Sequence, residues 1–393
     1  MESYVAEWLN LLVRWLHLMA GIAWIGSSFY FIWLDGHLEP YRGPNPRIAG
    51  ELWSVHGGGF YHNQKYRVGP ERLPAHLHWF KWEAYTTWMS GVGLLAIVYW
   101  HGASVYLIDK RVADLSVPLA ILLSIGVLIL GWLVYDSLCK LLRHDLVLGA
   151  LVFLFGVAAA WGLSRLFGAR AAYLHVGGMF GTIMSWNVFF VIIPGQKQMV
   201  EAIRVGRPPD PEGGRRGKQR SVHNNYLTLP VLFTMMSIHF PMTYGHPHAW
   251  LVLGVIGLAG VLIRHFFNLR HRGRDLWALP AAAAVLLGGL AVAIAPTGAD
   301  SRAAGRGPSF AQVRPVIQQR CSTCHSAAPT DKVFTAAPNG VVFDSPEQIK
   351  AMAARINERA VLTRTMPLAN LTGMTDDERG LLGGWIASGA KTE

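Results

Sequence analysis

Cys321, Cys324 and His325 stand in the pattern Cys-x-x-Cys-His, which is the attachment pattern of a c-type haem. Two thiols at this spacing can form thioethers with the haem vinyl groups, and the adjacent imidazole can then bind the iron. Met366, followed by Pro367, is the expected second ligand of the haem iron. Because ligation by histidine and methionine raises the reduction potential of a haem, the pattern predicts an electron acceptor.

A zinc site and a disulfide are the alternative interpretations of this pattern. Zinc needs further soft ligands, and residues 308–393 contain no other Cys or His. The third cysteine, Cys139, is expected to be an inert packing residue. Apolar residues recur at helical spacing before Cys321, and Trp385 lies on an expected last helix. The sequence therefore predicts a small class I-type cytochrome c domain over residues 308–393.

The remaining three quarters of the chain have the composition of a membrane protein. Hydrophobic residues make up 52% of the sequence and charged residues only 15%, and about 20 apolar residues are enough to cross a bilayer. We expect eight spans, at residues 8–34, 78–100, 117–138, 146–166, 171–193, 226–240, 249–269 and 277–295. The expected fold class is all-α: an eight-helix transmembrane bundle over residues 1–296, followed by a linker at 297–307.

The formal charge of +11 is a topology signal. Among the connections of the membrane region, those after the first, third, fifth and seventh spans hold seventeen Lys and Arg residues. The connections between them hold only Lys110, Arg111, Arg165 and Arg170. By the positive-inside rule both termini face outward, so the haem domain is predicted to be periplasmic in a multi-pass protein of the bacterial inner membrane. The positive net charge is then explained without a nucleic-acid partner, and membrane lipid is the expected surrounding of the spans.

Polar residues within apolar spans are costly and mark functional sites by default. Sorted by depth, they form an outer layer with Arg14, His17, His175, His239, His246 and His248, and an inner layer with Glu83, Asn187, His223, Asn224, Asn225, Arg264, His265 and Asn268. Histidines on different helices can hold a b-type haem, so His17, His175 and His239 are candidate ligands. The alternative for each is a histidine hydrogen-bonded to a neighbouring helix.

Two inner connections are long. Residues 35–77 contain a triple glycine flanked by aromatic and β-branched segments, 51–56 and 60–68, which predict a hairpin. The second connection, 196–221, is basic and rich in Gly and Pro, and we interpret it as a mobile loop without a recognisable motif.

Several segments resemble one family. They read WLHLMAGIAWIG at 15–26, VHGGGFY at 55–61, KY at 65–66, HWFKWEAY at 78–85 and HNNYLTLP at 223–230. The chain is similar to the integral-membrane urate oxidases of bacterial purine catabolism, in which a membrane region is fused to a cytochrome c. The resemblance covers both the membrane region and the haem domain. It implies oxidation of urate to 5-hydroxyisourate, with electrons passing to the c haem and on to a terminal oxidase or a soluble cytochrome c.

The residue roles follow from side-chain chemistry and not from the resemblance. Urate is a planar monoanion, so Arg264 or Lys65 can supply the positive charge. Asn224 and Asn225 can hydrogen-bond its amide edges. His223 or Glu83 can act as the base while two electrons leave and water attacks C5.

Three other functions compete with this hypothesis. The first is a membrane dehydrogenase for quinol or another small molecule, with the same haem as its output. The second is an electron carrier tethered to the membrane, although one helix would suffice for that. The third is a transporter, which would leave the haem pattern without a role.

Overall fold

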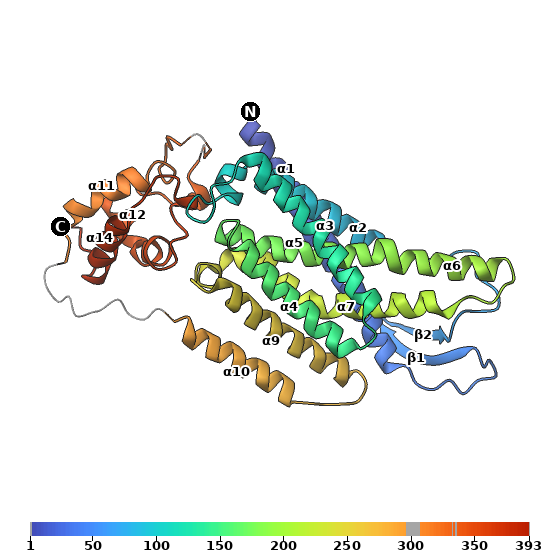
Figure 1. Ribbon diagram of the computed structural model, residues 1–393. Coiled ribbons are helices and arrows are strands. Elements are labelled where there is room, and N and C mark those ends of the chain that lie inside the picture. Colours follow the sequence, from blue (N-terminus) through green and yellow to red (C-terminus); the bar gives the residue numbers. More distant parts are fainter. Residues whose placement is uncertain (1, 296–306, 332, 335, 393) are drawn as a thin grey trace.

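The structure is a computed structural model that describes residues 2–295, 307–331, 333–334 and 336–392. Apart from Gly307, the predicted linker at 297–307 lies outside the described residues. The described part is mostly helical, and it consists of a long helical bundle with a small helical domain at one end (Figure 1). We call the small domain, residues 307–392, the tail.

The bundle is built from the helices α1 (Glu2–His37), α2 (Trp82–Leu94), α3 (Val117–Leu141), α4 (Asp145–Leu163), α5 (Ala169–Asn187), α6 (Ile193–Arg204), α7 (Pro211–Met236), α8 (Pro241–Tyr244), α9 (Ala249–Arg270) and α10 (Ala278–Ala293). Five described helical stretches are long and apolar enough to cross a membrane: Tyr4–His37, Val117–Leu141, Asp145–Leu163, Ala169–Arg204 and Ala249–Arg270. Of the predicted spans, 278–293 forms a shorter apolar helix, and the count of eight spans stays a prediction.

The core of the bundle lies between α3, α4, α5 and α9, where large side chains such as Tyr135, Phe167 and Leu148 are fully buried. Close approach of α5 to α7 depends on Gly177, because a side chain there would clash with Thr234. Small residues at helix crossings let membrane helices pack through direct backbone contact. The core thus fixes which face of α7 points to each neighbouring helix. Many of the candidate polar site residues lie on this helix.

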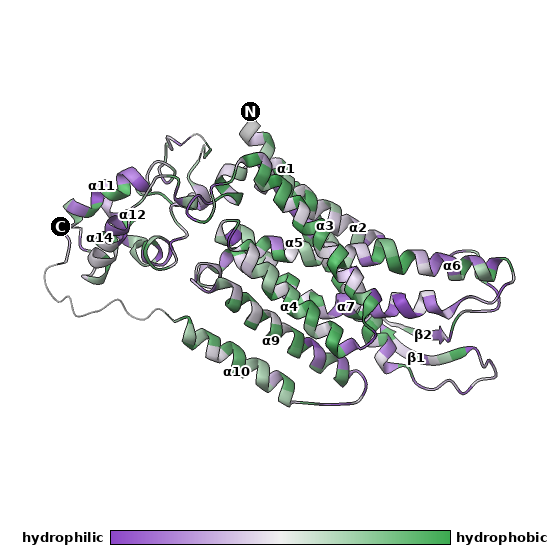
Figure 2. Cartoon of the chain, in the orientation of Figure 1, coloured by the Kyte–Doolittle hydropathy of each residue, from purple (hydrophilic) through white to green (hydrophobic). Residues whose placement is uncertain are grey.

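The predicted mobile loop at 196–221 is mostly helical instead. A π-helical turn, Val188–Ile192, joins α5 to α6 without a break, and α7 begins at Pro211 with Asp210 as its N-cap. The two helices pack so closely that a side chain on Gly195 would meet the backbone of Gly213. Figure 2 shows this segment as a hydrophilic projection from one end of the bundle. Gly195 and Gly213 thus serve helix packing, and the content of Gly and Pro alone does not distinguish such glycines from those of a loop.

The predicted hairpin is confirmed. Strand β1 (Ile48–His56) pairs antiparallel with β2 (Gly59–Tyr66), and Trp53 stands opposite His62. The turn residues Gly57 and Gly58 both have positive φ, 58° and 81°, which two-residue hairpin turns require. The hairpin lies beside the projecting part of α6 and α7 in Figure 1, and it is the exception to the expected all-α class.

The tail contains α11 (Phe310–Arg320), α12 (Pro346–Ala351), α13 (Ala353–Ile356) and α14 (Asp376–Ala387). Its own small core includes Val313, Ile317, Leu382 and Trp385, and the Trp385 side chain is only 1% exposed. Figure 1 shows the tail at the end of the bundle where α1 begins, which we call the tail end. The opposite end, where α1 and α9 finish, is called the basic end because Lys and Arg gather there.

Candidate functional site

A cavity of about 450 Å³ opens at the basic end between α1, α7 and α9. It is lined by Ile32, Asp35, Gly36, Lys218, Val222, Tyr226, His265, Asn268, Leu269 and Arg272. On α7 the lining residues are four apart, so they form one face of the helix. Three helices that meet at their ends therefore build a polar cavity from residues scattered over 240 positions of the sequence.

Asn225, Arg264 and Asn268 form a buried network beside this cavity, and Asn268 lines it. The Oδ1 atom of Asn225 accepts a hydrogen bond from Arg264 Nε at 2.9 Å and one from Asn268 Nδ2 at 3.0 Å. The Arg264 guanidinium also lies 3.9 Å from the centre of the Phe29 ring. Three further buried polar atoms of the network have no partner among the described residues: Asn225 Nδ2, Arg264 Nη2 and Asn268 Oδ1. Since buried polar groups are normally paired, these atoms are suited to bind a polar ligand.

Tyr226 and His265 form a second pair on the cavity wall. The Tyr226 hydroxyl and His265 Nδ1 are 2.6 Å apart, and both residues line the cavity. The hydrogen bond joins α7 to α9 and holds the imidazole in one orientation. An imidazole fixed beside a cavity can accept or donate a proton to a bound molecule.

The charge at the cavity is positive. Asp35 contacts Lys65 Nζ at 2.5 Å and Lys218 Nζ at 3.6 Å. Arg272 lines the cavity and Arg264 lies behind it. Two lysines contact the carboxylate and two arginines lie on or behind the cavity wall, so positive charge exceeds negative charge here, which favours an anionic ligand. Of these five, the sequence analysis identified only Lys65 and Arg264.

His223 and Asn224 lie on the opposite face of α7 from the cavity. His223 Nδ1 is 2.7 Å from the Tyr135 hydroxyl, while Asn224 Oδ1 accepts a hydrogen bond from Asn187 at 3.0 Å. Each residue of a helix is turned by about 100° from the last, so consecutive residues in the run from His223 to Tyr226 face different neighbours. The structure therefore does not bring these two predicted site residues together with Asn225 and Arg264.

Glu83 lies in the first turn of α2, and one of its carboxylate oxygens, Oε2, is buried without a partner among the described residues. Glu83 is not among the residues that line the cavity. Its predicted role as a base therefore stays a prediction.

The three candidate ligands of a b-type haem have different surroundings. His175 is fully buried, and both ring nitrogens are engaged: Nε2 with Ser124 Oγ at 2.7 Å and Nδ1 with the Ala171 carbonyl at 2.8 Å. His17 bonds α2 through Nδ1, and His239 lies on a short 3-10 turn. The described residues contain no cluster of three His, Cys, Asp or Glu side chains suited to a metal ion. A haem needs only two axial ligands, so the absence of such a cluster does not test it, and the b haem stays a prediction.

The Cys321–His325 segment does fit a covalently bound haem. His325 Nδ1 is 3.0 Å from the Val341 carbonyl, which as hydrogen-bond acceptor selects the tautomer that leaves Nε2 for a metal. Burial lowers the pKa of the His325 imidazole, so the neutral, ligating form prevails. Both cysteines are free thiols, and burial raises the pKa of Cys321 to about 12.

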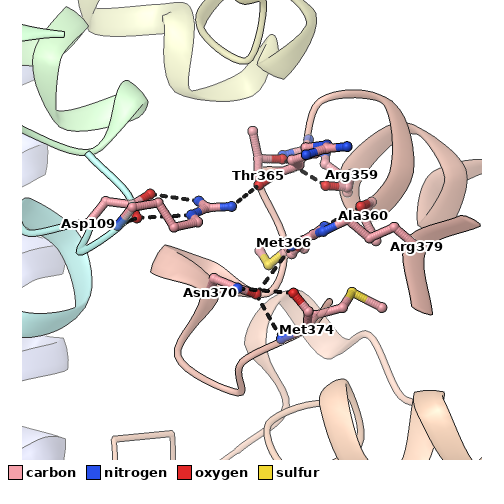
Figure 3. A network of polar contacts seen from close by, with 10 residues as sticks. Asp109, Arg359, Ala360, Thr365, Met366, Asn370, Met374 and Arg379 are labelled. Carbon is pink, nitrogen blue, oxygen red and sulfur yellow. Dashed lines mark hydrogen bonds and ion pairs between the residues drawn. The ribbon is translucent and has the colours of Figure 1, made fainter. Parts of the chain in front are cut away.

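Met366 lies in a segment whose backbone is fixed on both sides. Its N–H donates to the Arg359 carbonyl at 2.9 Å, and its carbonyl accepts from Arg379 Nη1 at 2.8 Å (Figure 3). Arg379 also donates to the carbonyl of Ala360 and, at 3.2 Å, to Asn370 Oδ1. A methionine held in this way is suited to act as a ligand of fixed position.

The tail contacts the bundle through Arg111, which forms an ion pair within the bundle and a hydrogen bond to the tail. Asp109 holds Arg111 by two contacts, of 3.0 Å and 2.6 Å, and Arg111 Nη1 approaches the Arg364 carbonyl at 3.5 Å. Burial acts to raise the pKa of Asp109, but the hydrogen bonds and charge of Arg111 outweigh it and leave that pKa below its usual value. Gly245 lies directly against Thr363 in the same interface. The Met366 segment is thus attached to the tail end of the bundle.

Sequence reasoning missed Asp35, Lys218, Tyr226 and Arg272. Tyr226 directly follows Asn225 in the run HNNYLTLP, and Asp35 is the first acid after the first apolar span. These were the available signals. Only the packing of three helix ends shows that the residues meet.

Comparison with known proteins gives one family. The family model described as "Urate oxidase N-terminal" matches residues 3–295. No curated protein and no solved structure matches the chain. Because the matched region covers the whole bundle, including the cavity at its basic end, the chain belongs to the urate oxidase N-terminal family.

Proposed function

We propose that this protein is a membrane-bound urate oxidase that converts urate to 5-hydroxyisourate and delivers the electrons to a c-type haem on its own tail. The proposal is carried by the buried network beside the cavity at the basic end, in which Asn225, Arg264 and Asn268 leave two hydrogen-bond donors and one acceptor without a partner among the described residues. Asn268 is the member of this network that lines the cavity. Urate is a planar anion with alternating carbonyl and N–H groups along its edges. Its chemistry therefore matches the free atoms and the charge of this cavity.

In this proposal Arg264 supplies the charge that binds the urate anion, through the Nη2 atom that has no partner. Asn225 Nδ2 donates to a urate carbonyl, and Asn268 Oδ1 accepts from a urate N–H. The contact of Arg264 with Phe29 and with Asn225 fixes the guanidinium plane, so little side-chain entropy is lost on binding. Lys218 and Arg272 attract the anion toward the cavity.

The reaction balances as the urate monoanion plus water giving 5-hydroxyisourate, one proton and two electrons. His265 takes the place of His223 as the proposed base, since it lines the cavity and is oriented by Tyr226. It accepts a proton from the water that attacks C5. When bound at Cys321, Cys324 and His325, the haem supplies a one-electron acceptor, so the two electrons of urate leave singly.

The proposal also includes the location and orientation of the protein in the membrane. The Lys and Arg distribution favours a bacterial inner membrane with the basic end in the cytoplasm and the tail in the periplasm. From the tail, electrons would pass to a terminal oxidase or a soluble cytochrome c. Several described helices are long and apolar enough for such a location.

The deciding experiment is an anaerobic optical titration of the purified, haem-loaded protein with urate. Two oxidised haems should be reduced per urate consumed. The Arg264→Gln variant should need roughly 10- to 150-fold more urate for the same rate of reduction, while dithionite reduces its haem as in the parent. A quinol added in place of urate serves as the competing substrate. Disappearance of urate without any change in the haem spectrum would contradict the proposal, and reduction by quinol alone would favour a quinol dehydrogenase.

A further inference from the structure

The cavity and the Cys321–His325 segment lie at opposite ends of the bundle. The cavity is formed where α1 and α9 finish, whereas Arg111, before α3, and Gly245, before α9, contact the tail. At a rise of 1.5 Å per residue, the part of α9 between Ala249 and His265 alone covers roughly 24 Å. Figure 1 shows the tail and the β1–β2 hairpin at opposite ends of the long axis. Most of the thickness of a hydrocarbon layer, about 30 Å, therefore lies between the two sites.

The segments that flank the cavity are hydrophilic and basic. The hairpin, the projecting ends of α6 and α7, and the connection after α9 carry the Lys and Arg residues that the positive-inside rule assigns to the cytoplasm. Lys65 and Lys218 belong to these segments, and both contact Asp35 at the cavity. The cavity thus opens on the cytoplasmic side if the bundle spans the membrane.

We propose that urate binds from the cytoplasmic side and that its two electrons cross the membrane outward to the tail one at a time, through a one-electron redox relay inside the bundle such as the predicted b haem, so that the reaction moves charge through the bilayer. This inference rests on the proposed function. It adds the side from which substrate is taken and makes the reaction electrogenic. The proton released on oxidation stays on the cavity side, and the two electrons appear on the side of the tail.

This direction has a consequence in the cell. An electron that leaves the cytoplasm carries negative charge outward, and a membrane potential that is negative inside assists that movement. Urate oxidation would then run faster in energised membranes than in depolarised ones. An enzyme whose urate site and haem lay on one side would show no such dependence.

The test uses the full-length, haem-loaded protein in sealed anaerobic vesicles, in which both orientations occur. Ascorbate, which does not cross the membrane, is added outside first and reduces the haem of molecules whose tail faces outward. Urate is then added outside. Because the remaining molecules expose the cavity, urate should reduce the rest of the haem, and the two steps together should equal the reduction seen with ascorbate in detergent.

A potential-sensitive dye gives the second measurement. The urate step should make the vesicle lumen negative, whereas the ascorbate step should leave the dye signal unchanged because its electrons do not cross the bilayer. The Arg264→Gln variant should need roughly 10- to 150-fold more urate for the urate step to proceed at the same rate, and should keep the ascorbate step. Lys110→Gln, an exposed substitution in the connection before α3, should retain both steps.

The outcomes separate the two proposals. If urate adds no reduction after ascorbate, although urate alone reduces all haem in detergent, the urate site lies on the side of the tail and this inference is wrong while the proposed function stands. A urate step without a dye response also contradicts the inference. If urate reduces no haem even in detergent, the proposed function fails and the inference with it.

Discussion

Tyr226 on α7 and His265 on α9 share a hydrogen bond of 2.6 Å across the wall of the cavity. The hydrogen bond joins two helices through residues that are 39 positions apart in the sequence. It fixes one ring nitrogen of the histidine and leaves the other for a ligand.

Replacing His265 should remove the proposed base. His265→Gln is expected to lower kcat by roughly 10²- to 10⁴-fold, the usual contribution of a positioned acid–base group, with a smaller effect on KM. Tyr226→Phe should cost less, because it removes only the group that orients the imidazole. The measurement is urate turnover with an excess of an artificial electron acceptor.

His223→Gln is the matched control for this comparison. His223 contacts Tyr135 on the other side of α7, so its replacement should affect thermal stability more than kcat. A loss of kcat in His223→Gln as large as that in His265→Gln would show that the reaction takes place on the α3 side of α7.

Arg264 should control the binding of urate. Hydrogen bonds to charged groups contribute about 1.5–3 kcal/mol, so Arg264→Gln should raise KM by roughly 10- to 150-fold. Arg264→Lys keeps the charge but not the planar fork, and should recover only part of the affinity. The control is Arg270→Gln, one turn and a half further along α9, where the side chain is exposed and pairs only loosely with Asp275 at 3.6 Å.

Cys321 and Cys324 should be required for covalent haem. The double variant Cys321→Ala, Cys324→Ala is expected to lose the haem that remains attached after denaturation in acidic acetone, because no thioether can form. Met366→His should keep the haem but lower its reduction potential, since methionine ligation raises it. A spectroelectrochemical titration measures this change, and an unchanged potential would show that Met366 is not the second ligand.

Arg111 should hold the tail against the bundle. Its charged hydrogen bonds to Asp109 position it beside the Arg364 carbonyl, and their loss in Arg111→Gln should weaken docking by roughly tenfold or more. Reduction of the haem by urate should then slow, while reduction by dithionite stays unchanged. The neighbouring exposed Lys110→Gln serves as control. Equal rates in both variants would exclude a role for Arg111.

Glu378 should make the stability of the tail pH-dependent. Its carboxylate accepts from the Thr375 N–H at 2.7 Å, which caps α14, and from Arg320 Nε at 3.0 Å. Partial burial acts to raise the pKa of Glu378, but these hydrogen bonds, with the charge of Arg320, lower it below the usual 4.5. A carboxylate with a lowered pKa stabilises the fold fully above its unfolded pKa, and this stabilisation disappears as the pH falls through the folded pKa.

Glu378→Gln should therefore destabilise the tail by about 1 kcal/mol at neutral pH, the usual contribution of a helix cap. The difference from the parent should begin to shrink below about pH 4.3, the pKa of Glu in the unfolded chain, and should vanish only below the lowered pKa of Glu378 in the fold, where its side chain is neutral too. Thermal unfolding followed by the haem spectrum measures it. Asp377→Asn, in the same exposed first turn, is the control, and a difference that persists at low pH would exclude the ionised carboxylate as its cause.

The sequence alone was enough to predict those features that depend on a local pattern of residues. The aromatic and β-branched segments around Gly57 and Gly58 predicted the hairpin. Arg264 and Asn268, four residues apart and both assigned to the inner layer, share the partner Asn225 in the structure. The pattern of Cys321, Cys324 and His325 predicted a haem attachment, and it stays a prediction. In each case neighbours along the chain are also neighbours in space.

The tertiary structure decided which faces meet. Neighbouring residues on α7 look equally polar in the sequence, but His223 contacts α3 and Asn225 contacts α9, because the helix turns each side chain away from the last. The glycines at 195 and 213 likewise indicate a loop by composition, yet they pack two helices together. The direction of a helix face relative to its neighbours depends on contacts between distant segments, so the cavity becomes visible only when α1, α7 and α9 are brought together.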